Sequence, residues 1–336
     1  MASIALVDQC GLCGKSEDLL RCTGCQAMFY CSRDHQVADR DAHKAACKKV
    51  ARKRKESQFE ETKIRNTPGG DPFSWGNAFE TGVGRFWSIL ETRDYMRARF
   101  AWASALGDLG TRTGVEEQLA HFMDMLRLCR GDNMGIRSLV PALMLRLNQD
   151  QECYDFAKWW FTMGSEGDYD WGNMDLPYLS IKGADVFEEV KFFTGRFPDL
   201  AQLVAVTLLK IKLVLDLEAL QKSTHTAGSK VPREVLDDIR SHVPRSPVIS
   251  NNRELVQSDD HKGTIKTLRE QIRQLYQAVA RTNEHYWKLL LSGKEPQLPS
   301  AFSKGSIEEA QLSFSYTIDA WYELPAAIDF IRTLQA

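Results

Sequence analysis

Cysteine and histidine residues are concentrated near the N-terminal end of this 336-residue chain and stand there in regularly spaced pairs. The pairs are Cys10/Cys13, Cys22/Cys25, Cys31/His35 and His43/Cys47. Six of the eight cysteines of the chain belong to them, so the clustering is not a uniform scatter. Four such pairs can give four ligands to each of two zinc ions. We therefore predict two structural zinc ions, because four protein ligands leave no coordination position for water.

The spacing within each pair has a structural reason. Two cysteines separated by two residues meet one metal ion when the chain folds back through a tight turn, and Gly24 lies inside one of these turns. The other two pairs are spaced four residues apart, which places both side chains on one face of a helix. We expect loops at the first two pairs and helices at the last two.

Disulfide bonds in a secreted protein are the alternative use of such cysteines. Residues 1–9 contain neither a basic segment nor a long apolar stretch, so we expect no secretory signal peptide. Disulfides would also leave His35 and His43 without a role. We predict reduced, metal-bound cysteines and a nuclear or cytoplasmic location, not a secreted one.

Residues 10–47 resemble a MYND finger. Beyond the two Cys-x2-Cys pairs, the residues that match its pattern are Tyr30, Cys31, His35, Gln36, His43, Lys44 and Cys47. The family usually has cysteine in place of His35, and imidazole is an ordinary zinc ligand. The resemblance implies interleaved sites, one formed by Cys10, Cys13, Cys31 and His35 and the other by Cys22, Cys25, His43 and Cys47. Spacing alone leaves this pairing open.

The resemblance also bears on partners. Several MYND fingers bind short proline-rich peptides against a tryptophan three residues before the penultimate ligand. Arg40 occupies that position here, whereas Gln36, a second residue of the peptide groove, is present. Proline-rich peptides are therefore one candidate partner, and whether the groove binds them without the aromatic ring is left open.

A run of basic residues follows the last pair. Residues 44–65 contain nine Lys or Arg against three Glu, although the whole chain carries a formal net charge of only −2. Three interpretations of this predicted helix remain open: a solvated linker, a nuclear-import signal, or a contact with nucleic acid. Nucleic acid is the least favoured, because residues 48–55 contain no interleaved aromatic side chain.

Helical patterning dominates the rest of the chain. The segment 67–72, Thr-Pro-Gly-Gly-Asp-Pro, cannot continue a helix and marks the clearest boundary. After it, apolar residues recur at intervals of three and four, as in 113–130 and 307–322. We predict an all-α body, and a faint repeat between 99–110 and 137–148 favours stacked hairpins like tetratricopeptide repeats.

The predicted domain organisation has five parts. They are a MYND zinc finger (1–50), a basic helical extension and linker (51–72), a helical-repeat-like domain (73–222), a mobile insertion (223–262) and C-terminal helices packing on the same body (263–336). The insertion is rich in Ser, Thr, Pro and charged residues, with a short helix expected at 233–241. The boundary at 67–72 implies that the finger unfolds independently of the helical body.

Two further observations concern the body. From Trp75 to about Leu217 it resembles fungal MYND-finger proteins, a resemblance that implies no known activity. The most apolar stretch, 203–217, contains Lys210 and Lys212 and is too short and too charged to span a bilayer. We expect it to form the central helix of the core, with no membrane contact.

Two functional hypotheses follow. The first is a zinc-binding scaffold protein whose finger and helical body bind other proteins; the alternative is a nuclear transcriptional regulator that contacts a transcription complex or nucleic acid through the finger and the basic helix. Lysine methylation is the enzymatic rival, because some MYND fingers are inserted in methyltransferases of the SET class. That class carries an Asn-His pair, and this chain has none. We therefore predict no enzymatic activity, and neither catalytic nor cofactor-binding residues.

Overall fold

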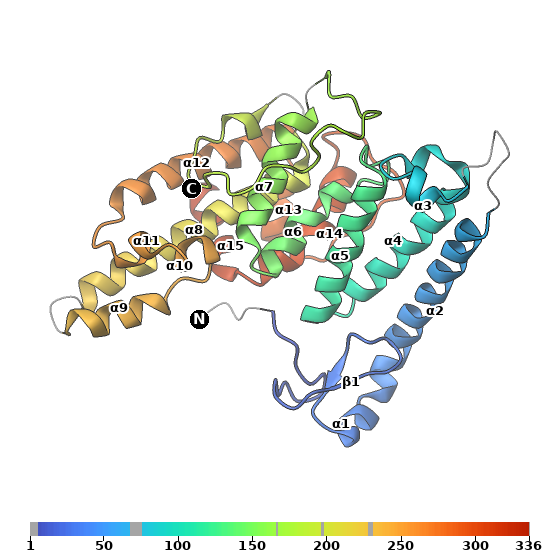
Figure 1. Ribbon diagram of the computed structural model, residues 1–336. Helices are drawn as coiled ribbons and strands as arrows, with labels where there is room; N and C mark the ends of the chain where they lie inside the picture. Colours follow the sequence, from blue (N-terminus) through green and yellow to red (C-terminus); the bar gives the residue numbers. More distant parts are fainter. Residues whose placement is uncertain (1–5, 68–75, 166, 196–197, 228–230, 336) are drawn as a thin grey trace. The chain divides into compact units, whose positions relative to one another are not determined.

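The computed structural model describes residues 6–67, 76–165, 167–195, 198–227 and 231–335 (Figure 1). Contacts divide the chain into two compact units. The finger unit comprises Leu6–Val140 and Asp170–Tyr178, and the C-terminal unit comprises Pro141–Tyr169 and Leu179–Ala336. Residues 68–72 of the predicted linker lie outside the described residues.

The finger unit contains two very short strands and a series of helices. Its elements are β1 (Leu20–Arg21), β2 (Phe29–Tyr30), α1 (Arg33–Ala38), α2 (Arg40–Arg65), α3 (Ala78–Thr81), η1 (Phe86–Ser88), η2 (Leu90–Thr92), α4 (Arg93–Gly107), α5 (Arg112–Leu128) and η3 (Ile136–Ser138). The strands pair antiparallel, with Leu20 opposite Tyr30. Helix α4 lies beside both α2 and α5, as Figure 1 shows. The amphipathic helix predicted within 113–130 is confirmed as α5, which begins where the Thr111 hydroxyl accepts a hydrogen bond from Gly114 N.

The C-terminal unit is helical throughout its described elements. They are α6 (Val140–Arg146), α7 (Asp150–Phe161), η4 (Met163–Ser165), η5 (Lys191–Thr194), α8 (Leu200–Ala227), α9 (Arg233–Ser241), α10 (Pro247–Ser250), α11 (Arg253–Gln257), α12 (Lys262–Thr282), α13 (Tyr286–Ser292), α14 (Ile307–Tyr322) and α15 (Pro325–Gln335). Helix α8 contacts α7, α9, α10, α12, α14 and α15. It is therefore the central helix of this unit, as the apolar stretch 203–217 predicted.

The two lysines of α8 are buried and are accommodated differently. Lys212 Nζ lies 2.9 Å from the Asp150 carboxylate, whose side chain is fully buried. Lys210 has no such ion pair with any of the described residues; its ammonium donates to the carbonyl of Val186 and, at 2.7 Å, to Gln271 Oε1. Burial lowers the pKa of Lys210 to about 7. Of the two lysines, Lys212 is thus a paired cation, whereas Lys210 is an amine that loses its charge easily.

None of the described helices is both long enough and apolar enough to cross a membrane.

The internal repeat expected in the body is not supported. The segments 99–110 and 137–148 are not equivalent helices, because the first is the end of α4 whereas the second contains η3 and the short α6, interrupted near Pro141. Tetratricopeptide-like stacking is therefore not confirmed. In the predicted insertion 223–262, residues 223–227 end α8, and α9, α10 and α11 follow, with the side chain of Arg240 fully buried. The mobility expected for this segment stays a prediction. The expected short helix at 233–241 is confirmed as α9.

The finger shares its apolar core with α4. The buried cluster contains Cys10, Cys22, Cys25, Ala27, Tyr30 and Val50 from the finger and α2, and Ala105 and Leu106 from α4. Trp102 and Leu109 pack against its edge. This cluster crosses the sequence boundary predicted at 67–72, because the helix that follows the boundary supplies part of the wall around the metal-binding residues.

Hydrogen bonds reinforce this shared core. Thr111 Oγ1 donates to the carbonyl of Ala27 at 2.6 Å, and Thr113 N donates to Asp8 Oδ1 at 2.9 Å. Lys49 of α2 and Asp108 form an ion pair of 2.7 Å between half-exposed side chains. The start of α5 and the end of α4 are thus tied to three separate parts of the finger and its extension.

Candidate metal centre

Two tight turns present the first four metal-binding residues. In the turn after Cys10, Gly14 N donates to the Cys10 carbonyl at 2.9 Å, and in the turn after Cys22, Gln26 N donates to the Cys22 carbonyl at 2.9 Å. A Cβ atom at Gly24 would lie 2.6 Å from Cys47 Sγ, closer than real Cβ contacts allow. Glycine is therefore required there by the neighbouring sulfur atom.

Three of the four residues of the later pairs lie near the start of a helix. His35 lies in α1, whose first turn is capped by Ser32 Oγ accepting from His35 N at 3.2 Å. His43 and Cys47 lie one turn apart in α2, as their spacing predicted. Cys31 differs from the prediction, because it sits on the turn between β2 and α1 and not in a helix. Cys31 directly follows β2, so the end of this strand places it at the metal site.

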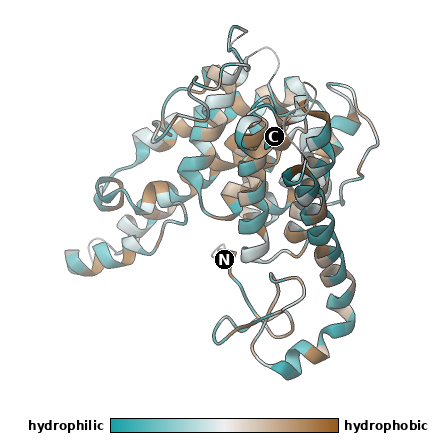
Figure 2. Cartoon of the chain, turned by 45° about the vertical axis from the view of Figure 1, so that its right-hand side comes forward, coloured by the Kyte–Doolittle hydropathy of each residue, from teal (hydrophilic) through white to brown (hydrophobic). Residues whose placement is uncertain are grey.

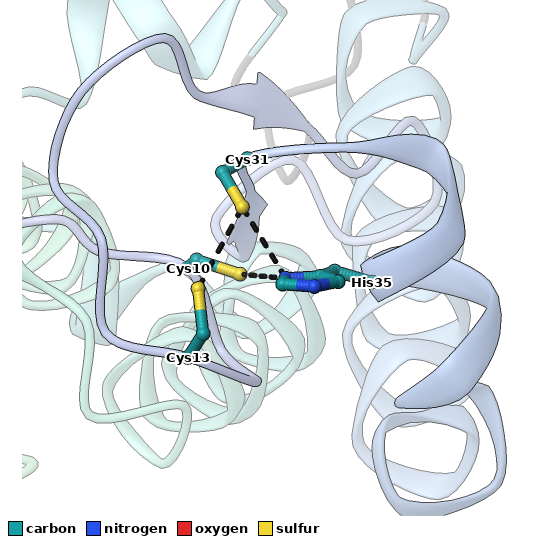
Figure 3. A group of neighbouring side chains, drawn as sticks. All are labelled: Cys10, Cys13, Cys31 and His35. Carbon is teal, nitrogen blue, oxygen red and sulfur yellow. Dashed lines mark hydrogen bonds between the residues drawn. The ribbon is translucent and has the colours of Figure 1, made fainter.

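The first group consists of Cys10, Cys13, Cys31 and His35 (Figure 3). Figure 3 shows the three sulfur atoms and the imidazole ring pointing toward one another. His35 Nδ1 lies 3.5 Å from Cys10 Sγ and 3.2 Å from Cys31 Sγ, and the sulfur atoms of Cys13 and Cys31 are 3.6 Å apart. His35 therefore offers Nδ1 to the site.

The second group consists of Cys22, Cys25, His43 and Cys47 and is more deeply buried. The sulfur atoms of Cys22 and Cys47 are 3.8 Å apart, and His43 Nε2 lies 3.5 Å from Cys25 Sγ. His43 therefore offers the opposite ring nitrogen to the one that His35 uses. Its ring packs edge-on against Tyr30, whose hydroxyl donates to Asp39 at 2.7 Å.

These distances fit tetrahedral zinc. With zinc about 2.3 Å from sulfur and about 2.0 Å from nitrogen, a tetrahedron has edges of about 3.8 Å between sulfurs and about 3.5 Å between sulfur and nitrogen. The observed separations of 3.2 to 3.8 Å match these edges. The chain thus provides two Cys3His sites in the interleaved pairing that the MYND resemblance implies, each with four protein ligands for one zinc ion.

The thiols of each group cannot all ionise without a cation. For Cys10, burial is the largest single effect and raises the pKa of the thiol. The hydrogen bonds from the Cys31, Cys13 and Leu12 N–H groups and from His35 together outweigh burial, so the pKa falls to about 5. Burial and the neighbouring sulfurs raise the pKa of Cys31 to about 11. The second group repeats the contrast, with the pKa of Cys22 at about 6 and that of Cys47 at about 12. A bound divalent cation offsets the repulsion between the neighbouring thiolates, so the remaining thiols lose their protons when it binds.

Sequence reasoning missed several residues that support the sites. Arg54 Nη2 of α2 donates to the carbonyl of Gly24 at 2.6 Å and so braces the second turn. Asp8, Thr111 and Thr113 join the finger to α5. No spacing rule points to these residues, because their partners lie about 30 to 105 positions away in the chain.

Comparison with known proteins agrees with this geometry. Residues 10–47 match the MYND finger family. Over 63 residues the chain is 40% identical to Egl nine homolog 1 of Mus musculus, covering 19% of this chain and 16% of that protein. The human Egl nine homolog 1 is 53% identical over 38 residues, which is 11% of this chain and 9% of that protein. The chain thus covers less than a fifth of either relative, and no solved structure matches.

Replacing His35 with alanine should lower the zinc content from two ions per chain toward one. The first group would keep three sulfur ligands and lose one corner of its tetrahedron, whereas no ligand of the second group changes. Elemental analysis of the purified, untagged protein measures this directly. His35→Cys is the matched variant and should retain two ions, because cysteine is the family's usual ligand there. Two ions in His35→Ala would mean that His35 is not a ligand.

Proposed function

We propose that this protein is a non-catalytic interaction protein, in which two structural zinc ions hold a MYND finger that binds other proteins and the helical body provides the scaffold. The observation that carries the proposal is the completeness of both ligand sets. Each has three sulfur atoms and one imidazole nitrogen, with no position left for substrate or activated water. Zinc in such a site stabilises a surface and performs no chemistry. We propose a nuclear or cytoplasmic location, where cysteines stay reduced.

The outer surface of the finger supports partner binding. Three apolar side chains are about half exposed on a module with a very small interior: Leu12 at 48%, Leu20 at 55% and Val37 at 57%. Val37 follows Gln36 in α1, and the exposed Arg40 begins α2. Gln36 Oε1 accepts a hydrogen bond from Arg33. A proline-rich peptide would meet an apolar side chain, an amide and two guanidinium groups here, with no aromatic wall.

A peptide array tests this proposal. The full-length, zinc-loaded protein is applied to proline-rich peptides, each paired with a version in which alanine replaces every proline. We expect proline-dependent binding that Val37→Glu weakens at least about tenfold, because the change places a charge among the apolar contacts. The matched control is Val235→Glu, since Val235 is also exposed (46%) but lies on α9 of the C-terminal unit. Equal effects of the two variants would contradict binding by the finger.

The basic surface of α2 favours a second candidate, a nuclear regulator that contacts nucleic acid. A salt series separates the two. Binding through many phosphates weakens steeply as salt rises, because each neutralised phosphate releases a counterion, whereas binding through an apolar surface changes little. A steep slope with duplex DNA, together with no peptide binding, would favour the regulator over the scaffold protein.

A further inference from the structure

Helix α2 has two opposite faces with different roles. Val50, Ser57 and Ile64 are buried on the face toward α4. Four cations, Lys44, Lys48, Arg52 and Lys55, are all exposed. At about 100° per residue, these four lie within a strip about 80° wide on the opposite side of the helix. Figure 2 shows how strongly hydrophilic this long helix is. We call these four residues the basic stripe.

The charges of the basic stripe are largely uncompensated. Among the described residues, no carboxylate lies within 4 Å of the ammonium groups of Lys44, Lys48 or Lys55, and Arg52 is 3.6 Å from Glu56. Four cations of α2 outside the stripe, Lys49, Lys53, Lys63 and Arg65, each have a carboxylate partner at 2.6 to 2.7 Å. A fifth, Arg54, donates to the Gly24 carbonyl. The small side chains of Ala45 and Ala51 flank the stripe and line a shallow groove with Lys48, Arg52 and Lys55 of the stripe and with Lys49.

The stripe has definite ends. Lys44 and Lys55 are eleven positions apart, which is about 16 Å along a helix and matches about five residues of an extended peptide. Two residues lie in line with the stripe beyond its ends. Asp41, an exposed carboxylate, precedes Lys44, and Phe59, 62% exposed, follows Lys55. A nucleic-acid backbone would continue past both ends and would meet a like charge at Asp41. A short acidic peptide meets only the cations.

We propose that the basic stripe binds a short acidic segment of a partner protein, about five residues long and followed by an apolar residue that contacts Phe59. The inference rests on the proposed interaction function and adds a second site to the finger, on a different face of α2 from the one that contacts α4. The positive charge of the stripe favours an acidic partner, and its short length favours a peptide over a long polyanion.

Fluorescence anisotropy with the full-length, zinc-loaded protein tests the proposal. The probe is a labelled peptide with five consecutive glutamates followed by leucine, compared with the same peptide carrying glutamines. The stripe variant is Lys44→Glu/Lys48→Glu/Lys55→Glu. The matched control is Lys182→Glu/Lys266→Glu/Lys294→Glu, which shifts the net charge equally at three exposed lysines of the C-terminal unit. Zinc content and circular dichroism verify that both variants fold.

We expect the glutamate peptide to bind wild type and control alike, and to bind the stripe variant at least about tenfold more weakly. Equal affinity for stripe variant and control, or no preference for glutamate over glutamine, would overturn the proposal. So would tighter binding of a labelled single-stranded DNA than of the peptide at physiological salt. The proline-rich peptides serve as the separate test of the finger: if they still bind when the glutamate peptide does not, only the basic stripe is refuted.

Discussion

Replacement of Cys25 with serine is expected to destabilise α4 and α5 together with the finger. Cys25 is a ligand of the second group and a buried member of the cluster that Ala105 and Leu106 complete. Zinc supplies folding free energy on the order of 10 kcal/mol to modules of this kind. Loss of even part of it should lower the melting temperature of the finger unit by about 10 °C or more.

Hydrogen exchange measured by mass spectrometry shows which helices respond. We expect faster exchange in α4 and α5 as well as in the finger, because unfolding of the finger removes the buried contacts and the Thr111–Ala27 hydrogen bond that they share. Cys129→Ser is the matched control: Cys129 is buried in the same unit, donates to Asn133 and belongs to neither of the two metal-binding groups, so both zinc ions should remain. Unchanged exchange in α4 and α5 after Cys25→Ser would instead support an independent finger that ends before residue 67.

The two lysines of α8 should respond differently to the same substitution. Lys212→Met leaves the fully buried Asp150 carboxylate without its cation and should cost about 3 to 5 kcal/mol of unfolding free energy. Adding Asp150→Asn should recover part of this loss, because it removes the unpaired charge. Lys210→Met removes a desolvated amine that has no carboxylate partner at ion-pair distance in the described residues. The variant therefore leaves no carboxylate without its cation and loses the hydrogen bonds of Lys210 to Val186 and Gln271. Chemical denaturation of the three variants at pH 7 measures the difference.

The pH dependence of stability distinguishes Lys210 further. Its pKa in the folded protein is about 7, below the ordinary value of 10.5, because burial disfavours the charged form more than Asp185 and Glu188 favour it. Between these values the unfolded chain binds more protons than the folded one, so stability rises with pH. Wild type should gain on the order of 2 kcal/mol relative to Lys210→Met from pH 7 to pH 9. Parallel stability curves would contradict a depressed pKa.

The sequence predicted those elements that depend on interactions between residues close together in the chain. The bounds of α9 and α14 coincide with the segments 233–241 and 307–322 in which we expect helices from the sequence. Ser306 caps the start of α14, and its hydroxyl accepts a hydrogen bond from Glu309 N, a start signal contained in four residues. The metal-binding residues are likewise close in sequence, so their spacing sufficed to identify them.

Features that depend on distant contacts could not be predicted in this way. The proline and glycine residues of 67–72 correctly indicate a break in the helix, but such a break says nothing about which surfaces pack together afterwards. Val50 and Ala105 belong to one cluster, although 55 positions separate them. The apparent repeat failed for a related reason, because similar apolar spacing in 99–110 and 137–148 does not require similar partners.

Helix α2 carries two zinc ligands near its start and then contacts α4 along its length. Cellular zinc supply should therefore govern the amount of this protein as well as the occupancy of its finger. A newly made chain that finds no metal would display the apolar side of α4 to chaperones and proteases, which remove incompletely folded proteins. We expect its abundance to fall in zinc-starved cells and to recover on zinc addition, without any change in its messenger RNA.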